Sequence, residues 1–471
     1  MNNFQISPEV DRNKVFLINR SELAGRIDAN THHPERRDAI AQIKRSTFRV
    51  EKLGFITSFS KNIVTTIVVT DIYVGLENIE SNTGIFIDSN RKESICSALS
   101  FKTGQVLFPK LRPYLNKVFY ANFDGICSTE FHILDGEKID NRYLFYFLGL
   151  DIIVKQTSLL MSGNTLPRLQ TEDIKNLLIP IPPKETQLTI VAKMDAAYAN
   201  KKQKETEAQR LLDSIDDYLL GELGIELPAR EENTLQSRMF TRRLSEVSGG
   251  RFDPDYFQEY YREIQQSLHN GQFSCKAIKN VADLVINGNT PASNDYSDKE
   301  TNYPIIKVKS YQGDFISLEK LDFTKEKKIK RAKKHDIFLL SAAHQASYVG
   351  RFMKYLDREP LENSSFVGEL ICIRANKSTC NPMYLFSLLN SEPYKILLNR
   401  EKTGQTSHIY PTDIKHIKIP IPPLEKQTEI ANHITKIRNQ AKQLQQQAKT
   451  ELDQAKKEVE AMILGDGESK V

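Results

Sequence analysis

The stretch Ile179-Pro-Ile-Pro-Pro183 returns as Ile419-Pro-Ile-Pro-Pro423, 240 residues further along this chain of 471 residues. Over the twelve residues that begin at each first isoleucine, eight positions are identical. An Asp-Ile-Lys tripeptide at 173–175 and again at 413–415 extends the match upstream in the same register. An internal repeat fixes the architecture, and this period is far too long for a solenoid. The chain is therefore predicted to be a duplicated two-part unit.

A long amphipathic helix is predicted to follow each copy of the Ile-Pro motif, over residues 184–224 and 424–465. About 40 residues at 1.5 Å each make a rod of roughly 60 Å. In the second segment the apolar residues alternate steps of four and three, as in a coiled-coil seam, whereas Lys201 and Lys204 interrupt the seam of the first. A narrow apolar stripe needs a partner, and the nearest partner of each helix is the other. If a pseudo-twofold axis relates the two halves, the helices pair antiparallel.

Short β-rich runs, separated by Gly, Pro and Asp turns, are predicted to be strands in the first half. These runs are residues 63–69, 106–108, 117–120 and 130–134. Residues 143–148 are predicted to form a buried helix with Asn141 as its N-cap. The second half repeats this order, since Tyr384-Leu-Phe386 echoes Tyr143-Leu-Phe145.

These elements predict an α+β fold. We expect two similar mixed α/β globular domains, separated by two long antiparallel coiled-coil helices and related by a pseudo-twofold axis. The expected boundaries are 1–178 and 231–418 for the globular domains, and 179–230 and 419–471 for the helical segments.

Composition indicates a well-solvated protein, with 39% hydrophobic and 27% charged residues. No run approaches the ~18 apolar residues of a membrane helix, and residues 1–13 lack the apolar region of a secretory signal. The five cysteines are odd in number and form no Cys-x-x-Cys pair, which favours reduced thiols over disulfides or zinc. We therefore expect a cytoplasmic protein that does not bind membranes. A net charge of +5 is compatible with polyanion binding but is weak support for it.

Four further segments accompany the twin Ile-Pro helices. They are Tyr73-Val-Gly-Leu-Glu-Asn-Ile79, Lys110-Leu-Arg-Pro-Tyr-Leu-Asn-Lys117, Cys127-Ser-Thr-Glu-Phe131 and Gly288-Asn-Thr-Pro291. With these landmarks in order, and the helices in duplicate, the chain resembles the specificity subunit of a type I restriction–modification system over nearly its whole length.

The resemblance implies a DNA-reading scaffold. Residues 1–178 and 231–418 would be target recognition domains, each reading one half of an asymmetric, two-part DNA target. Residues 179–230 and 419–471 would be conserved spacer helices, which set the unread gap and dock modification subunits. A homodimeric reader imposes a palindrome with half-sites about 34 Å apart, whereas one chain with two unlike domains does not.

The resemblance also implies the partners. Besides double-stranded DNA, these are two modification subunits, which bind S-adenosylmethionine and methylate adenine N6, and a restriction (motor-nuclease) subunit, which uses ATP and Mg, as a further candidate. The chain itself is expected to be non-catalytic and to hold no cofactor or metal. It has no Gly-x-x-x-x-Gly-Lys-Ser/Thr phosphate loop and no Asp/Asn-Pro-Pro-Tyr/Phe adenine-binding tetrapeptide. Base flipping would belong to the partner.

In the first half, candidate DNA contacts cluster beside a predicted strand. They are Lys110, Arg112, Tyr114, Asn116 and Lys117. Arg112 could pair bidentately with guanine and Asn116 with adenine. The alternative is that the apolar residues between them pack a turn while the charges face water. Two small polar loops add candidates suited to close approach to phosphate, although ordinary loops would look the same: Ser162, Asn164, Thr165, Gln405 and Thr406.

In the second half, the densest basic run spans residues 325–334, before a predicted strand at 336–340. Its alternative is a solvated surface helix. Polar residues after that strand occupy the position of the first-half cluster, and we expect them to include base contacts. The candidates of this half are Lys307, Lys309, Lys328, Arg331, Ser341, His344, Gln345 and Arg351.

The histidines favour no metal site. His132 lies within a strand pattern and is expected to be a core residue, and His32-His33 beside Glu35 is too small a ligand set.

Two other classes of function remain open. A single-chain methyltransferase or nuclease with built-in recognition would need a catalytic motif, and none is recognised. A structural coiled-coil adaptor with protein-binding domains would lack the salt-dependent DNA affinity that phosphate contacts produce.

Overall fold

The structure is a computed structural model that describes residues 7, 9–20, 23, 27–66, 71–88, 97–161, 168–229, 234–235, 239–247, 251–326, 330–404 and 407–465. The chain divides into two compact units. Unit 1 is Met1–Glu205 with Gln446–Val471, and unit 2 is Thr206–Gln445. Each unit contains one part of each long helix, α5 (Lys184–Leu223) and α11 (Leu424–Leu464).

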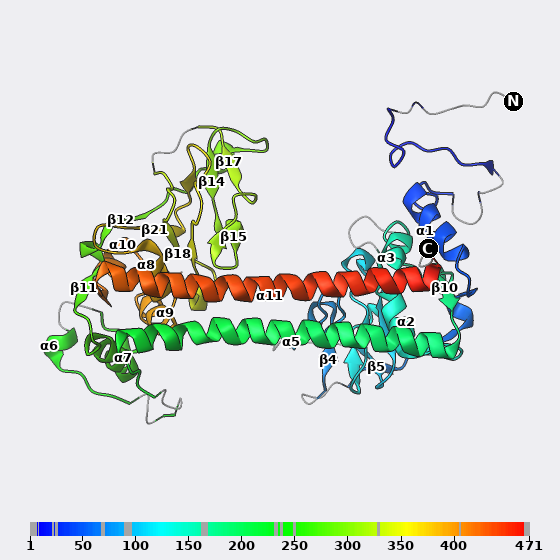
Figure 1. The fold of residues 1–471 in the computed structure, drawn as a ribbon, viewed down its shortest axis with the longest axis horizontal. Coiled ribbons are helices and arrows are strands. Elements are labelled where there is room, and N and C mark those ends of the chain that lie inside the picture. Colours follow the sequence, from blue (N-terminus) through cyan, green and yellow to red (C-terminus); the bar gives the residue numbers. More distant parts are fainter. Residues whose placement is uncertain are drawn as a thin grey trace. The chain divides into compact units, whose positions relative to one another are not determined.

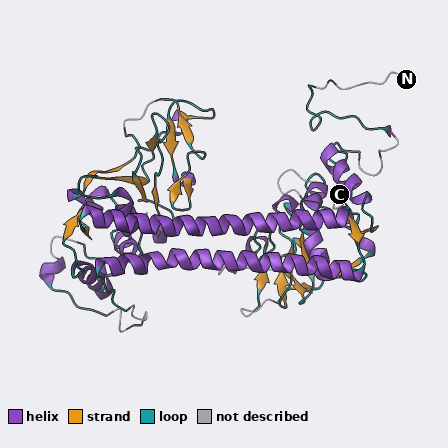
Figure 2. Cartoon of the chain, viewed as in Figure 1, coloured by secondary structure: helices purple, strands orange, loops and turns teal. Residues whose placement is uncertain are grey.

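Unit 1 places short strands beside the first part of α5 and the last part of α11 (Figure 2). Its helices are α1 (Pro34–Lys44), α2 (Asn141–Leu148), α3 (Asp151–Thr157) and α4 (Thr171–Lys175). Its strands are β1 (Arg49–Lys52), β2 (Thr57–Ser60), β3 (Ile63–Val64), β4 (Tyr73–Val74), β5 (Ala98–Phe101), β6 (Val106–Pro109), β7 (Phe119–Tyr120), β8 (Gly125–Cys127), β9 (Phe131–Gly136) and β10 (Leu178–Ile181). The sheets have the orders β2-β9-β6-β7, β3-β5-β8-β4 and β1-β10.

Unit 2 has helices and strands in a closely similar order. Its helices are α6 (Leu244–Val247), α7 (Glu259–His269), α8 (Pro382–Leu389), α9 (Glu392–Arg400) and α10 (Pro411–Lys415). Its strands are β11 (Cys275–Ala277), β12 (Ala282–Asn287), β13 (Tyr296–Ser297), β14 (Pro304–Ile306), β15 (Tyr311–Gln312), β16 (Phe315–Ile316), β17 (Asp322–Thr324), β18 (Ile337–Leu340), β19 (Met353–Tyr355), β20 (Ser365–Phe366), β21 (Leu370–Ala375) and β22 (Lys418–Pro420). The sheets have the orders β12-β21-β18-β19-β16-β15, β13-β17-β14-β20 and β11-β22.

The two units share one strand frame. The order β2-β9-β6-β7 returns as β12-β21-β18-β19, and β16 and β15 extend the second sheet. The second four-stranded sheet of unit 1 and that of unit 2 also share a parallel pair at the corresponding place, β4 with β8 and β14 with β20. The predicted duplication of a mixed α/β unit is therefore confirmed within the described residues.

The Ile-Pro motif fastens each unit through its backbone carbonyls. Proline lacks an N–H but keeps its carbonyl acceptor. The buried Tyr143 hydroxyl donates to Pro180 O at 2.9 Å, and the Tyr384 hydroxyl donates to Pro420 O at 2.8 Å. The motif therefore has a structural role in both units.

A buried glutamine closes the same junction in both units. Gln187 Nε2 donates to Pro182 O and Gln427 Nε2 to Pro422 O, each at 2.8 Å. Their Oε1 atoms accept from the backbone N–H groups of the α2 and α8 N-cap residues at 3.0 and 2.7 Å. Each glutamine therefore ties the first turn of a long helix to the globular part of its unit.

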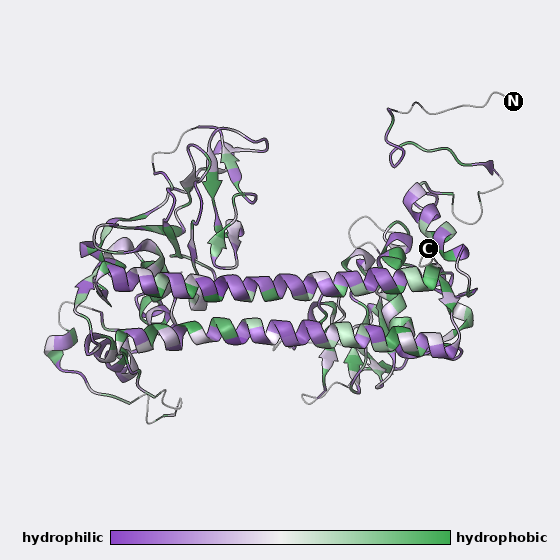
Figure 3. Cartoon of the chain, in the orientation of Figure 1, coloured by the Kyte–Doolittle hydropathy of each residue, from purple (hydrophilic) through white to green (hydrophobic). Residues whose placement is uncertain are grey.

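The two long helices lie side by side and antiparallel within each unit (Figure 1). In unit 1 Lys193 pairs with Glu458 at 2.6 Å. In unit 2 the rings of Tyr218 and His433 stack with centroids 4.1 Å apart. Both helices are mostly hydrophilic, with hydrophobic residues at intervals (Figure 3). The predicted helix bounds and the antiparallel pairing agree with the structure.

Lys201, predicted to interrupt the seam, is buried in it. Its side chain is 8% exposed and pairs with Glu205 at 2.8 Å and Glu80 at 3.5 Å. A buried ammonium group needs such carboxylate partners to offset its desolvation. The mostly apolar seam therefore tolerates the charge of Lys201, because Glu80 from a loop of unit 1 supplies a carboxylate partner.

Two local predictions need correction. The N-cap of α2 is Asp140, whose carboxylate accepts from Arg142 N and Tyr143 N, while Asn141 is already helical. The alternative of a surface helix in the basic run is also wrong for its described residues, because 325–326 and 330–334 contain no helical turn. Residues 67–69 of the first predicted strand lie outside the described residues, and only 63–64 form β3.

Among the described helices, none combines the length and apolar character needed to cross a membrane. The described cysteines are free thiols: Cys127, Cys275, Cys372 and Cys380.

Candidate nucleic-acid interface

Two loops follow equivalent central strands, one in each unit. We call residues 110–117 the β6 loop and residues 341–351 the β18 loop. Lys110 N donates to Glu130 O at 2.8 Å, and Ser341 N donates to Glu369 O at 2.9 Å. The first residues of the two loops therefore occupy equivalent positions in the backbone frame, as the sequence predicted.

A second segment lies against the start of each loop. Leu169 N donates to Lys110 O at 2.9 Å, and Ile409 N donates to Ser341 O at 2.9 Å. These partners directly follow the two small polar loops that the sequence singled out. A backbone hydrogen bond thus joins the start of each strand-end loop to a described residue that follows one of the small polar loops in the sequence.

Arg112 and Tyr114 are the outward-facing residues of the β6 loop. Arg112 adopts a left-handed backbone, with φ 50°, immediately before Pro113. Tyr114 is 47% exposed. A guanidinium and an aromatic ring held on one exposed turn are suited to phosphate or base contacts.

Lys110 and Arg168 surround Glu130 at the base of the β6 loop. Arg168 donates twice to Glu130, at 2.9 and 2.7 Å, and Lys110 Nζ donates to Thr129 O at 2.7 Å. Hydrogen bonds from Arg168 hold the pKa of Glu130 below its usual value although burial opposes them. Burial lowers the pKa of Lys110, while Glu130 acts against that shift. Arg168 is not among the residues predicted from the sequence, where its only signal is its place just after the first small polar loop.

Asn116 and Lys117 support the β6 loop from within. Asn116 is 7% exposed, and its amide donates to Gly149 O at 2.8 Å. Lys117 Nζ donates to Leu76 O at 2.8 Å. Both side chains already donate hydrogen bonds within the fold. A contact from either of them to DNA remains a prediction, and it would require the side chain to leave its present partner.

The β18 loop divides into a buried base and an exposed middle. Ser341 is 2% exposed and its hydroxyl donates to Glu369 O at 3.0 Å, whereas His344 and Gln345 are exposed. At the far end Arg351 pairs with Glu392 at 2.5 Å. The middle of the loop therefore offers the imidazole and amide groups for recognition.

The other second-half candidates lie apart from this loop in the hydrogen-bond network. Lys307 and Lys309 both pair with Asp322, Lys307 at 3.2 Å, and Lys307 Nζ lies 4.5 Å from the Tyr296 ring centre. Burial alone would raise the pKa of Asp322, but hydrogen bonds from Lys309 and Lys307 hold it lower. Arg331 donates to Asn363 Oδ1 at 2.5 Å.

Several candidates lie outside the described residues. They are Ser162, Asn164, Thr165, Lys328, Gln405 and Thr406.

His132 is a core residue, as predicted. It is 3% exposed and packs edge-on against Phe59, with ring centroids 5.5 Å apart. Burial lowers the pKa of His132 to about 4, and Lys110 and Lys61 add to the shift. Within the described ranges no group of three or more His, Cys, Asp or Glu residues is placed to hold a metal ion.

Known proteins share this organisation. A family model described as the type I restriction modification DNA specificity domain matches residues 79–210 and 271–454. The specificity subunit of the Escherichia coli type I restriction enzyme EcoDI is 34% identical over 99 residues, covering 21% of this chain and 22% of that protein. A putative type I restriction enzyme MjaX specificity subunit from Methanocaldococcus jannaschii is 25% identical over 182 residues, covering 37% and 42%. The matches therefore span less than half the length of these relatives.

Solved structures give longer but weaker matches. The HsdS subunit from Thermoanaerobacter tengcongensis is 18% identical with a TM-score of 0.36, covering 89% of this chain and 97% of that one. The S subunit of a type I restriction–modification system from M. genitalium is 14% identical with a TM-score of 0.42, covering 90% and 97%.

Proposed function

Because this chain belongs to the type I restriction modification DNA specificity family, we propose that it is the DNA-reading subunit of a type I restriction–modification complex. Its target recognition domains would be residues 1–178 and 231–418, and its spacer helices residues 179–230 and 419–471. Each domain would read one half of an asymmetric, interrupted target, and the helices would set the gap and dock modification subunits.

The observation that carries the proposal is one backbone frame with two different reading loops. The two loops start at equivalent strand ends, one in each unit. The β6 loop presents Arg112 and Tyr114, whereas the β18 loop presents His344 and Gln345. Sequence is read by side chains at base edges, and phosphate contacts only position the protein. Two unlike side-chain sets on one frame therefore support two unlike half-sites.

The chemistry would belong to the partners. We propose that two modification subunits bind S-adenosylmethionine and methylate adenine, and that a restriction subunit with ATP and Mg can join them. The chain itself would be non-catalytic, would hold no cofactor, and would act in the cytoplasm on double-stranded DNA.

Mapping of methylated adenines tests this proposal in cells that express the chain with its own modification subunits. An asymmetric motif interrupted by a fixed gap is expected, and a continuous palindrome would contradict it. Replacing residues 14–178 with the corresponding domain of another family member should change one half of the motif only. A change in both halves, or in neither, would refute the assignment of one half-site to each domain.

Salt dependence separates this proposal from a protein-binding adaptor. Phosphate contacts release counterions, so the DNA affinity of the purified chain should fall steeply with rising salt. An adaptor would show no such slope.

A further inference from the structure

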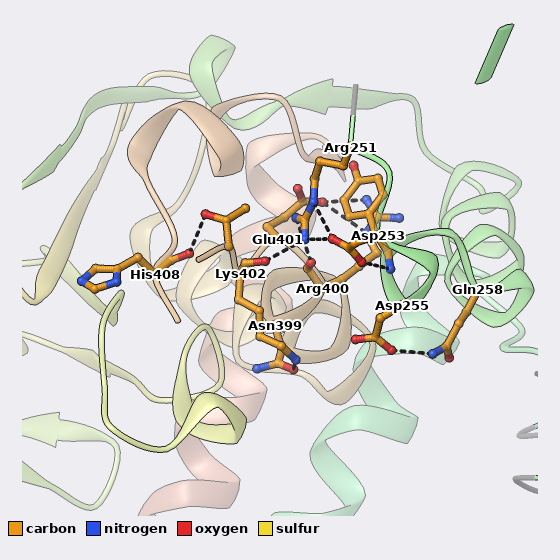
Figure 4. Close-up of polar contacts among 11 residues, drawn as sticks. Arg251, Asp253, Asp255, Gln258, Asn399, Arg400, Glu401, Lys402 and His408 are labelled. Atoms are coloured by element: carbon orange, nitrogen blue, oxygen red, sulfur yellow. Dashed lines mark hydrogen bonds and ion pairs between the residues drawn. The ribbon is translucent and has the colours of Figure 1, made fainter. Parts of the chain in front are cut away.

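The C-terminal end of α9 lies where the two loops of the unit 2 interface meet. We call this cluster the α9 hub: Arg251, Asp253, Tyr256, Asn399, Arg400 and Lys402 (Figure 4). Of the second loop of this interface, residues 403–408, the structure describes Thr403, Gly404, Ser407 and His408, and two backbone hydrogen bonds of 2.8 and 2.9 Å join Thr403 to His408. A bridge between Ala342 and His408 joins it to the β18 loop.

Asn399 holds the β18 loop. Its Nδ2 donates to Val349 O at 2.7 Å and to Ala346 O at 3.0 Å, just beyond the exposed His344 and Gln345. Its Oδ1 accepts from Lys402 Nζ at 3.0 Å. One amide therefore links the β18 loop to the residue that precedes the second loop.

The backbone at Gly350 packs closely against the C-terminal end of α9. Gly350 has φ +77°, and a Cβ there would lie 2.8 Å from the Leu398 carbonyl carbon and 2.9 Å from Asn399 N. The loop and the helix end are thus in direct backbone contact.

Arg251 holds the base of the second loop. Its guanidinium donates to Lys402 O at 2.8 Å and to Arg400 O at 3.4 Å. Carbonyls at a helix C-terminus lack intrahelical donors and attract cations. Arg251 therefore satisfies acceptors that α9 leaves open, and it fixes the chain as it leaves the helix.

The position of Arg251 is itself fixed by its neighbours. Asp253 accepts from Arg251 Nε at 2.9 Å, and the guanidinium groups of Arg251 and Arg400 each lie 4.5 Å from the centre of the Tyr256 ring. Glu401 pairs with Arg400 at 2.7 Å, so both cations have a carboxylate partner. The cation–π contacts and ion pairs make a rigid support from a segment that precedes α7.

We propose that the α9 hub fixes the β18 loop relative to the paired residues Thr403 and His408, so that Arg251 and Asn399 are positioning residues for DNA reading by unit 2. This inference rests on the proposed function. Small displacements of recognition groups weaken discrimination more than they weaken phosphate contacts, because only base contacts depend on exact hydrogen-bond geometry.

The test maps adenine methylation in cells that express full-length variants with the modification subunits. Arg251→Met and Asn399→Ala should broaden the base preference at the half-site read by unit 2, about tenfold in discrimination against single mismatches. The other half-site should stay as in the wild type and serves as an internal reference. Arg262→Met is the matched control, because Arg262 makes its ion pair with Glu259 within α7 and is not part of the α9 hub.

The outcomes are distinguishable. An unchanged motif in both variants, or equal broadening of both half-sites, overturns the role of the hub. A wild-type chain that directs no interrupted motif refutes the proposed function instead. If a variant loses all methylation because unit 2 unfolds, Arg251→Lys decides, since it keeps the charge but lacks the planar guanidinium that contacts Lys402 O, Asp253 and the Tyr256 ring together. One-sided broadening by Arg251→Lys supports the proposal, and a wild-type motif overturns it.

Discussion

The β6–β9 pair of unit 1 and the β18–β21 pair of unit 2 have the same register, but the charges of the side chains next to them differ. In unit 1, Gln105 at the start of β6 donates to Asp135 on β9 at 3.4 Å. In unit 2 the acid lies on the other strand: Asp336 precedes β18 and accepts two hydrogen bonds from Arg374 on β21, each at 2.7 Å. A hydrogen bond from an uncharged amide to a carboxylate in one unit is thus replaced by a buried ion pair in the other.

The backbone role of this position is the same in both units. Gln105 Oε1 accepts from Lys102 N at 2.9 Å, and Asp336 Oδ2 accepts from Lys333 N at 2.7 Å. Each side chain therefore closes the turn before its strand. The frame therefore requires a hydrogen-bond acceptor at this position, whereas the charge of the side chain can vary.

The largest expected effect comes from Asp336→Ala. The Asp336 side chain is fully buried and Arg374 is 22% exposed, so the substitution leaves a partly hydrated, unpaired cation. Breaking a buried pair costs about 3–5 kcal/mol, and hydration of Arg374 places this one near about 3 kcal/mol. Hydrogen exchange at the β18 and β21 amides should accelerate accordingly.

Gln105→Ala is the matched variant in unit 1. It removes one long hydrogen bond from an uncharged amide to Asp135 and a turn acceptor, and should cost about 1 kcal/mol at the β6 and β9 amides. Equal losses in the two units would show that the ion pair adds nothing to the frame.

The second effect depends on pH and distinguishes His132 from its unit 2 counterpart, Ile371. Phe108 faces His132 in unit 1, and Leu339 faces Ile371 in unit 2. Burial lowers the pKa of His132 from 6.5 to about 4. Between these values the unfolded chain takes up a proton that the folded chain does not, so stability is full above pH 6.5 and is lost as pH falls towards 4. The loss reaches roughly 3 kcal/mol.

His132→Ile places the unit 2 residue in unit 1 and should remove this pH dependence. Urea midpoints of the variant and the wild type, measured from pH 7 to pH 4, should diverge as the pH falls. Parallel curves would mean that His132 is protonated in the folded state.

The third comparison concerns a hairpin that docks on the long helices in each unit. In unit 2 the tip residue Asp314 lies 2.9 Å from Arg438 Nε on α11, and Arg438 also donates to Ser387 Oγ at 3.0 Å. In unit 1 the tip carbonyl of Thr83 accepts from Tyr198 on α5 at 2.8 Å, beside the Lys201–Glu80 pair. One buried cation carries the contact in unit 2, whereas several groups share it in unit 1.

Arg438→Met should therefore loosen its hairpin more than Lys201→Met loosens the other. The first should cost about 2 kcal/mol, because Asp314 is a third exposed and can hydrate, and the second about 1 kcal/mol or less. Hydrogen exchange at β15 and β16, compared with residues 79–86, measures both. A larger loss of protection from Lys201→Met than from Arg438→Met would mean that the unit 1 hairpin depends more strongly on a single cation than the unit 2 hairpin does.

The sequence predicts what periodicity and repetition encode. The bounds of α5 and α11, the duplicated frame and the equivalence of the loops that follow β6 and β18 all come from spacing. It does not predict pairings between distant positions, such as Arg168 with Glu130 or Arg251 with Lys402, because these depend on chain reversals that leave no local pattern. The burial of Lys201 is missed for the same reason, since its partner Glu80 lies far away in the sequence.

The same limit applies to the candidate DNA contacts, because the sequence does not show which of them are buried. Charge and turn chemistry single out Arg112 and Tyr114, which the structure places in solvent. The same criteria also select Asn116, whose amide is buried against Gly149 O. Polarity alone cannot separate a residue that reads DNA from one that supports the loop, because both need hydrogen-bonding groups at a turn.

The smallest effect tests what the units share. Tyr143→Phe and Tyr384→Phe each remove one hydroxyl that donates to the first proline carbonyl of an Ile-Pro motif, at 2.9 and 2.8 Å. Both rings are fully buried, so each change leaves one carbonyl without its donor and should cost about 1 kcal/mol, equally in the two units. Hydrogen exchange at the first turns of α5 and α11 measures the pair within one sample. Equal losses mean that the motif is a common fastening, independent of the domain beside it; clearly unequal losses would mean that the divergence of the reading domains extends into the helices that carry them.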